Sequence, residues 1–358
     1  MRSALYLLLL PLLLSGTALA ATPVQSIGEM SEYKTVKEDD TLIEIAYRED
    51  VGYVELRAAN PGLDPWLPGE GKTVLLPKQH LIPEGPRSGI VINLGEMRLY
   101  YYKDKGKPPQ SFPIGIGREG LNTPKGSTTV VEKKVAPTWT PTPRMRSEHP
   151  ELPASVGPGP DNPLGPVALY LGWPEYRIHG TNRPWGIGRR VSSGCLRMYN
   201  QDIRKLFGQV PVGTKVTVVD QPVKTAWIDG VFYIEAHPNA EQSDQIEHSG
   251  GKPDYEVSES EIAAVMRAAS GHGDAVDWSK VRKALRYRPG YPMAVSRTVK
   301  DMEKVTVTAD ATSHEEKKAD IKTNAKKAKE DMTTKALVPK PKAESSKERK
   351  HEALDMNG

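Results

Sequence analysis

The single cysteine of this chain, Cys195, follows the short segment Ser192-Ser193-Gly194, and a histidine, His179, lies upstream of it. A thiol beside an imidazole can act as a nucleophile, with the imidazole as its base. The alternative is a small buried side chain that only packs, because free cysteine is among the most buried residue types.

The residues around Cys195 favour chemistry over packing. Small residues before the thiol let the backbone turn its N–H groups, such as that of Gly194, toward negative charge that forms on a substrate oxygen. Arg197 is a fixed cation just beyond the thiol and suits a substrate carboxylate. A neighbouring imidazolium can stabilise the thiolate form of a cysteine. The pattern therefore indicates nucleophilic catalysis.

The N-terminus has the features of an export signal. A positive start is followed by an apolar run over residues 4–14 and by small residues over 15–20. This pattern predicts a signal peptide over residues 1–20, cleaved after Ala20. A membrane anchor is the alternative, but Pro11 interrupts a run that is too short for the roughly 20 apolar residues of a span. Exported proteins usually hold cysteines in pairs, so an unpaired thiol indicates that the sulfur itself is used.

Composition narrows the class of protein. The length of 358 residues allows two domains with extensions, and 31 glycines and 31 prolines beside 3 phenylalanines favour short strands joined by turns. The net charge of +4 is small and does not indicate nucleic-acid binding.

Residues 32–78 predict a small unit of four elements. Residues 33–36 and 72–77 alternate as strands, and residues 42–47 and 53–60 have helical apolar spacing. The Tyr-x-Val, Asp-Thr-Leu, Ala-Asn-Pro and Leu-Pro-Gly motifs of this βααβ unit resemble those of a LysM domain. The resemblance implies binding of peptidoglycan glycan; an accessory fold without a ligand is the alternative.

Residues 88–220 are rich in predicted strands, at 90–94, 97–102, 111–117, 127–132, 167–171 and 216–219. The segment 137–166 is irregular, and Trp139 within it favours an ordered lid. Residues 201–207 predict a helix.

Two regions follow the strand-rich segment. Residues 221–295 predict a small α+β appendix with a strand at 231–235 and helices at 258–269 and 278–287. Residues 296–358 are rich in Lys, Ala and Glu and lack aromatics, which predicts a disordered tail.

The motifs resemble those of the L,D-transpeptidase (YkuD-type) family. His179-Gly180-Thr181, followed after a loop by Ser192-Ser193-Gly194-Cys195-Leu196-Arg197-Met198, resembles the family signature. Asn122-Thr123-Pro124-Lys125-Gly126 resembles a turn of the same family. Ser193 stands where many members have a second histidine. The whole architecture is similar to a periplasmic branch that carries a LysM unit and links outer-membrane protein to peptidoglycan.

The resemblance implies a mostly β fold, with a β-sandwich catalytic domain, and a two-step acyl transfer. Cys195 would attack the bond between diaminopimelate and D-alanine in a tetrapeptide stem and form a thioester. His179 would move the protons, oriented by the carbonyl of Gly180. The remaining implied roles are an oxyanion hole from the amides of Ser193, Gly194 and Cys195, and substrate binding by Arg197, Ser192, Trp139 and Trp185.

The resemblance also implies the partners: peptidoglycan stems and glycan, and carbapenems that acylate Cys195. It implies a periplasmic enzyme without cofactor or metal. The acyl acceptor stays open between a second stem peptide, an outer-membrane protein, which the architecture favours, and water, which would make a carboxypeptidase. A non-catalytic peptidoglycan-binding protein is the alternative from another class.

The other motifs in the sequence give weaker indications of function. Gly115-x-Gly117-x-x-Gly120 mimics a dinucleotide fingerprint, but no βαβ unit surrounds it. The other histidines lack metal-ligand spacing and are predicted to lie on the surface or in loops: His80, His149, His237, His248, His272, His314 and His351.

Overall fold

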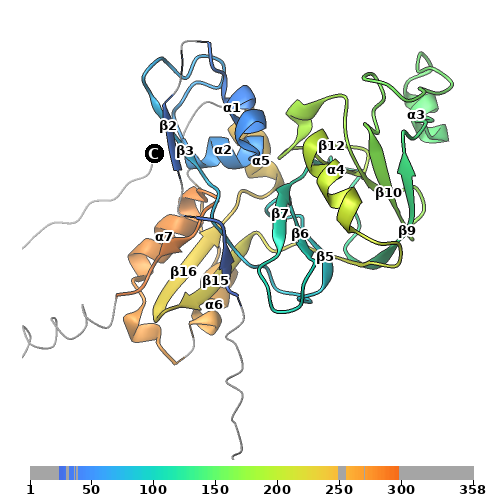
Figure 1. Ribbon diagram of the computed structural model, residues 1–358. Helices are drawn as coiled ribbons and strands as arrows, with labels where there is room; N and C mark the ends of the chain where they lie inside the picture. The colour runs from blue at the N-terminus through green and yellow to red at the C-terminus, as the bar shows by residue number, and fades with distance from the viewer. Residues whose placement is uncertain are drawn as a thin grey trace, which may run out of the picture. The chain divides into compact units, whose positions relative to one another are not determined.

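The structure is a computed structural model that describes residues 24–29, 32–35, 37, 39–248, 255–269 and 271–297 (Figure 1). The predicted signal peptide and the tail beyond residue 297 lie outside these residues. Within the described part, no helix is both long and apolar enough to span a bilayer. All of the described residues belong to one compact unit.

The N-terminal elements follow the predicted strand, helix, helix, strand order. They are β2 (Glu32–Thr35), α1 (Leu42–Glu49), α2 (Tyr53–Ala59) and β3 (Thr73–Leu76), with β2 and β3 paired antiparallel. Thr41 begins α1 with a capping box to Glu44, which satisfies the free N–H groups of the first turn. Asp50 ends α1 in a left-handed conformation. A short pair, β1 (Ser26–Ile27) with β4 (His80–Leu81), leads to the next region.

The central region is mostly β, as predicted. Its eight-stranded sheet has the order β13-β11-β10-β9-β14-β5-β6-β7. The strands are β5 (Gly89–Asn93), β6 (Arg98–Tyr102), β7 (Gln110–Pro113), β9 (Gly126–Val135), β10 (Val167–Leu171), β11 (Arg177–His179), β13 (Leu196–Arg197) and β14 (Lys215–Val219). A second pair joins β8 (Ile116–Gly117) to β12 (Arg190–Ser192). A β-sandwich would have two large sheets packed face to face. Within the described residues, this region instead has one eight-stranded sheet and one two-stranded sheet.

Three helical segments accompany this sheet: α3 (Pro143–Glu148), η1 (Pro184–Gly186) and α4 (Asn200–Gln209). The prediction missed β11, β12 and β13, which have only two or three residues each. The irregular segment 137–166 contains α3, and a bridge between Trp139 and Val156 holds it together. Buried Asn162 adds hydrogen bonds to three carbonyls of the same segment.

The C-terminal region has more structure than predicted. Its sheet consists of β15 (Val223–Ile228), β16 (Val231–Ala236) and β17 (Met293–Ala294). The helical segments are α5 (Ala240–His248), α6 (Glu259–Ala268), η2 (Gly273–Ala275) and α7 (Trp278–Tyr287). Of these elements, β16, α6 and α7 agree with the predicted ones, whereas β15, α5 and β17 were not predicted.

Helix α2 is built into the central region. Val54 and Ala58 belong to the same apolar core as β5, β6 and β10. The N–H groups of Tyr53 and Val54 donate to the carbonyls of Ile187 and Gly188, at 3.2 Å each. These carbonyls come from the loop between His179 and Cys195, so the N-terminal unit supports the loop that carries the motif. Helix α2 also lies beside α5 of the C-terminal region (Figure 1).

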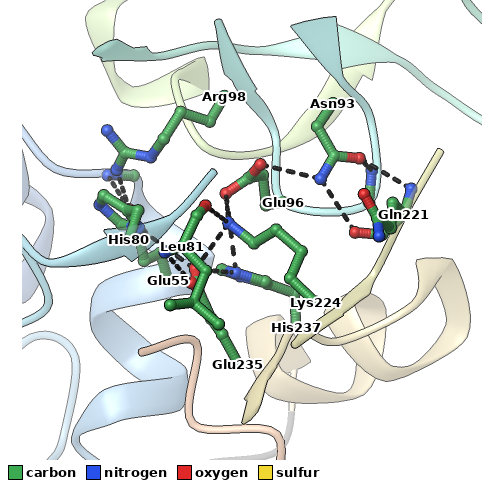
Figure 2. A network of polar contacts seen from close by, with 12 residues as sticks. Glu55, His80, Leu81, Asn93, Glu96, Arg98, Gln221, Lys224, Glu235 and His237 are labelled. Atoms are coloured by element: carbon green, nitrogen blue, oxygen red, sulfur yellow. Dashed lines mark hydrogen bonds and ion pairs between the residues drawn. The ribbon is translucent and has the colours of Figure 1, made fainter. Parts of the chain in front are cut away.

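A buried network of charges joins the same three regions (Figure 2). Lys224 on β15 lies 2.5 Å from Glu96 in the β5–β6 turn and 2.9 Å from Glu235 on β16. It also donates to the carbonyl of Leu81 on β4 at 2.8 Å. Arg98 pairs with Glu55 of α2 at 2.7 Å. Because buried charges are tolerated only when paired, the network fixes how these elements assemble.

Gly188 provides a test of the contact between α2 and the motif loop. Its φ is +73°, and an added Cβ would lie 2.3 Å from Gly52 Cα and 2.4 Å from the nitrogen of Tyr53. Gly188→Ala is therefore expected to force the loop off α2 and to destabilise the protein by about 1–3 kcal/mol in urea unfolding.

The matched control is Gly208→Ala. Gly208 lies inside α4, and a Cβ added there would have no neighbouring atom within 4 Å, so alanine should be neutral or stabilising by about 0.5–1 kcal/mol. Equal unfolding midpoints for the two variants would contradict the close contact.

Candidate active site

The pairing of β11 with β13 brings the motif residues together. These strands run parallel with Ile178 opposite Leu196 and His179 opposite Arg197. Ile178 and Leu196 are buried in the central core. Because side chains alternate across a sheet, His179 and Arg197 lie on the opposite face. The same register, continued by one residue, sets Cys195 opposite Arg177 on that face.

This face opens into a cavity of about 500 Å³. Cys195, His179 and Arg197 line it, together with Trp139 of the irregular segment. Its charged lining is mainly cationic, with Arg144, Arg177 and Arg197 against Glu175. The cavity therefore suits a ligand that carries carboxylates and presents a carbonyl to the thiol.

His179 is buried and held in one tautomer. Its Nδ1 lies 2.6 Å from the carbonyl oxygen of Gly180. A carbonyl can only accept, so Nδ1 carries the proton and Nε2 has a free lone pair. Burial and the charge of Arg197 lower the pKa of His179 from 6.5 to about 3, although the bond to Gly180 opposes this. The imidazole is therefore neutral at physiological pH and fit to accept a proton.

Cys195 is partly exposed and carries a neutral thiol at rest. Its Sγ donates to the carbonyl of Glu175 at 3.3 Å, and Glu175 has a left-handed φ of +67° that aims this carbonyl. Burial raises the pKa of the thiol, while the positive charges of Arg177 and Arg197 lower it. The thiolate–imidazolium pair considered in the sequence analysis is therefore not the resting state.

Ser192 organises the turn before the thiol. Its buried hydroxyl donates to the carbonyl of Cys195 at 2.6 Å and accepts from the amide of Gly194 at 3.1 Å. The Gly194 amide is therefore engaged within the loop, whereas the amides of Ser193 and Cys195 donate to no group within the described part of the chain. These two amides are the donors available to an oxyanion, and Ser192 orients the turn.

Gly194 meets a strict spatial requirement. Its φ is +104°, and a Cβ would lie 3.0 Å from the ring of Tyr176. Its carbonyl accepts from the hydroxyl of Thr123 at 2.8 Å. Thr123 comes from the Asn-Thr-Pro-Lys-Gly segment, so that motif supports the thiol turn.

The structure does not bring every predicted site residue to the cavity. Trp185 on η1 is 52% exposed and is not among the lining residues. Conversely, Arg177 and Glu175 line the cavity but were missed. The alternation of Arg177-Ile178-His179 around one apolar residue could have identified Arg177 from the sequence.

One group among the described residues could offer three metal ligands: His80, Glu96 and Glu235. The Lys224 ammonium already lies between the two carboxylates, so a cation would have to displace it. The prediction that His80 lies on the surface or in a loop is wrong, because His80 is buried on β4 in this network. His237 lies in the loop after β16, as predicted, although its side chain is buried in the same network. His149, His248 and His272 are exposed, as predicted, and His314 and His351 lie outside the described residues.

Known proteins are similar to this chain over most of its length. The YkuD family, described as the L,D-transpeptidase catalytic domain, matches residues 87–218. The probable L,D-transpeptidase ErfK/SrfK of Escherichia coli strain K12 is 43% identical over 257 residues, which cover 70% of this chain and 81% of that protein. The probable L,D-transpeptidase YbiS of the same strain is 42% identical over 270 residues, covering 73% and 86%.

Among solved structures, the catalytic domain of the E. faecium L,D-transpeptidase is 25% identical and covers 37% of this chain and 95% of that chain, with a TM-score of 0.29. The alignments with the two Escherichia coli proteins extend over more than two thirds of each chain. The family match includes the segment that holds His179 and Cys195. This chain belongs to the L,D-transpeptidase family.

Proposed function

We propose that this protein is a peptidoglycan L,D-transpeptidase that acts through Cys195. The observation that carries the proposal is the single sheet face on which a thiol, a neutral imidazole and cationic side chains share one cavity. A tetrapeptide stem suits this cavity, because it carries several carboxylates and the carbonyl between diaminopimelate and D-alanine.

In the first step, Cys195 Sγ attacks this carbonyl and its proton passes to His179 Nε2. The amides of Ser193 and Cys195 stabilise the oxyanion. The bond between carbonyl carbon and D-alanine nitrogen then breaks, the imidazolium protonates the leaving amine, and a thioester remains. In the second step, the incoming amine attacks the thioester carbonyl and neutral His179 takes a proton from it. The bond between carbon and sulfur then breaks, and the imidazolium returns the proton to the sulfur of Cys195.

Substrate carboxylates are bound by the cations that line the cavity. Arg197 holds a carboxylate of diaminopimelate, because its guanidinium can bind a carboxylate through two parallel hydrogen bonds. Trp139, held by its bridge to Val156, forms a wall of the groove.

The acceptor is an amine, and the architecture favours an amine of an outer-membrane protein over a second stem peptide. Mass spectrometry of muropeptides from sacculi of cells with and without the gene tests this. Protein-linked muropeptides support the tethering role, and diaminopimelate–diaminopimelate crosslinks support stem-to-stem transfer. Trimmed tripeptides without either product would instead indicate water as acceptor and a carboxypeptidase. The predicted signal peptide supports a location in the periplasm.

The βααβ unit binds peptidoglycan glycan through a surface away from the catalytic cavity. Trp66 and Leu67, on the loop between α2 and β3, are 66% and 76% exposed, and Asp64 caps this loop through the amides of both residues. An exposed ring on an ordered loop can pack against a sugar face.

Trp66→Ala is expected to weaken binding to intact sacculi about tenfold, which corresponds to about 1.4 kcal/mol. Pull-down with purified sacculi measures it, and Val212→Ala, which trims another exposed apolar side chain, is the control. Unchanged binding of the Trp66 variant would rule out this surface. A point variant is preferable to deletion of the unit, because Val54 and Ala58 belong to the central core.

A further inference from the structure

Arg177 lies next to the thiol, and the proposed proton-transfer steps do not use it. The parallel register of β11 and β13 sets it opposite Cys195, just as it sets His179 opposite Arg197. Neighbouring strands lie about 4.8 Å apart, so in-register side chains on one face touch when they are long. Arg177 also lines the catalytic cavity.

The guanidinium of Arg177 is held in place by an aromatic ring. Its Cζ lies 5.0 Å from the centroid of Tyr170, the residue paired with it on β10. Its Nε is buried and has no hydrogen-bond partner among the described residues. The ring lies on the opposite side of β11 from Cys195, and it holds the guanidinium on the cavity face. Unlike an ion pair with a carboxylate, this stacking leaves the positive charge of Arg177 unneutralised.

His179 does not supply positive charge to the resting thiol, because its imidazole is neutral. Burial raises the pKa of the thiol, and the charges that oppose this and favour ionisation of the sulfur come from two arginines, Arg177 first and Arg197 second. A guanidinium keeps its charge at every relevant pH.

We propose that Arg177 is a catalytic residue that activates Cys195 by stabilising the thiolate. This role rests on the proposed transfer reaction. As the thiol proton passes to His179 Nε2, the electron pair stays on the sulfur and the Arg177 guanidinium balances its charge. Arg177 neither gives nor takes a proton. When the thioester forms, the sulfur becomes neutral, so the stabilisation acts on the nucleophile and not on the product.

The experiment measures the rate of Cys195 alkylation by iodoacetamide between pH 6 and pH 10. Arg177→Met, which keeps the chain length but removes the charge, is expected to move the midpoint of the profile up by about one pH unit. The alkylation rate at pH 7 should fall only about threefold, because a less acidic thiol gives a more nucleophilic thiolate. Arg177→Lys, which keeps a positive charge, should return the midpoint most of the way to the wild-type value.

Lys134→Met is the matched control. The Lys134 ammonium also lies over the Tyr170 ring, at 4.8 Å, but this residue is exposed, pairs with Glu132 and does not line the cavity. Its alkylation profile should equal that of the wild type. Circular dichroism establishes that each variant is folded before its profile is compared.

An unchanged midpoint in Arg177→Met would overturn the proposal, and an unchanged midpoint with a raised KM for stem peptides would make Arg177 a substrate-binding residue instead. The profile does not depend on transpeptidase turnover. If the wild type formed no acyl-enzyme with a stem peptide but the midpoint still moved, the proposed function would fail while thiol activation by Arg177 stood.

Discussion

Replacing Cys195 by alanine is expected to abolish acyl-enzyme formation, both with tetrapeptide stems and with a carbapenem. The chain has no other cysteine, so no second thiol can take over. Removal of a catalytic nucleophile commonly costs a factor of about 10⁶ in turnover, and covalent capture should disappear altogether. Intact-protein mass spectrometry after incubation with a carbapenem measures the result directly.

The controls separate the nucleophile from its base. His179→Gln keeps the thiol and should still be acylated, but about 10²–10⁴-fold more slowly, because only proton transfer is impaired. Val212→Ala, outside the cavity, should be acylated like the wild type. A carbapenem mass shift that persists in Cys195→Ala would refute the assignment of the nucleophile.

The pH dependence of acylation should follow the ionisation of the Cys195 thiol. Because the pKa of His179 is lowered to about 3 by burial and Arg197, this imidazole is a competent base throughout the neutral range. The thiol has a raised pKa, so the acylation rate should rise with pH toward the alkaline side.

Local patterns made the motif and the main elements predictable. Thr41 and Glu44 form the capping box that begins α1, and the small residues before Cys195 form the predicted turn. The sequence also allows a prediction that Arg177 and His179 share one face of a strand and that Cys195 and Arg197 share one face of another. Arg-Ile-His and Cys-Leu-Arg each alternate around one apolar residue. The sequence does not show that these two short strands pair in parallel, which is what makes Arg177 and Cys195 neighbours.

Interactions between distant segments were not predictable in the same way. Lys224 and Glu96 are 128 residues apart, and nothing in the sequence around either indicates a buried pair. The cap that the Ile187 and Gly188 carbonyls provide for α2 likewise uses backbone atoms, which leave no residue signature. Through these contacts the N-terminal unit packs against the catalytic loop and supports it. Without them, only a linker would join the unit to the central region.

Lys224→Met is expected to cause the largest loss of stability, about 3–5 kcal/mol, because it leaves the Glu96 and Glu235 carboxylates buried without their cation. Urea unfolding at pH 7 measures the free energy. Lys215→Met, at an exposed position of β14, is the control and should stay within about 0.5 kcal/mol of the wild type. The double variant Lys224→Met with Glu96→Gln should recover part of the loss, since it removes one uncompensated charge.

The difference between wild type and Lys224→Met should also depend on pH. Burial opposes ionisation of Glu235, but Lys224, His237 and His80 outweigh it and hold the pKa well below 4.5. A lowered pKa in the folded state contributes stability above the unfolded value, and this contribution is lost as the pH falls through the folded value. Without Lys224, burial favours the protonated form of the Glu235 carboxyl, and a protonated carboxyl needs no buried cation. The stability gap should therefore narrow between pH 7 and pH 4.5, and a gap that stays constant would show that Lys224 contributes packing rather than charge.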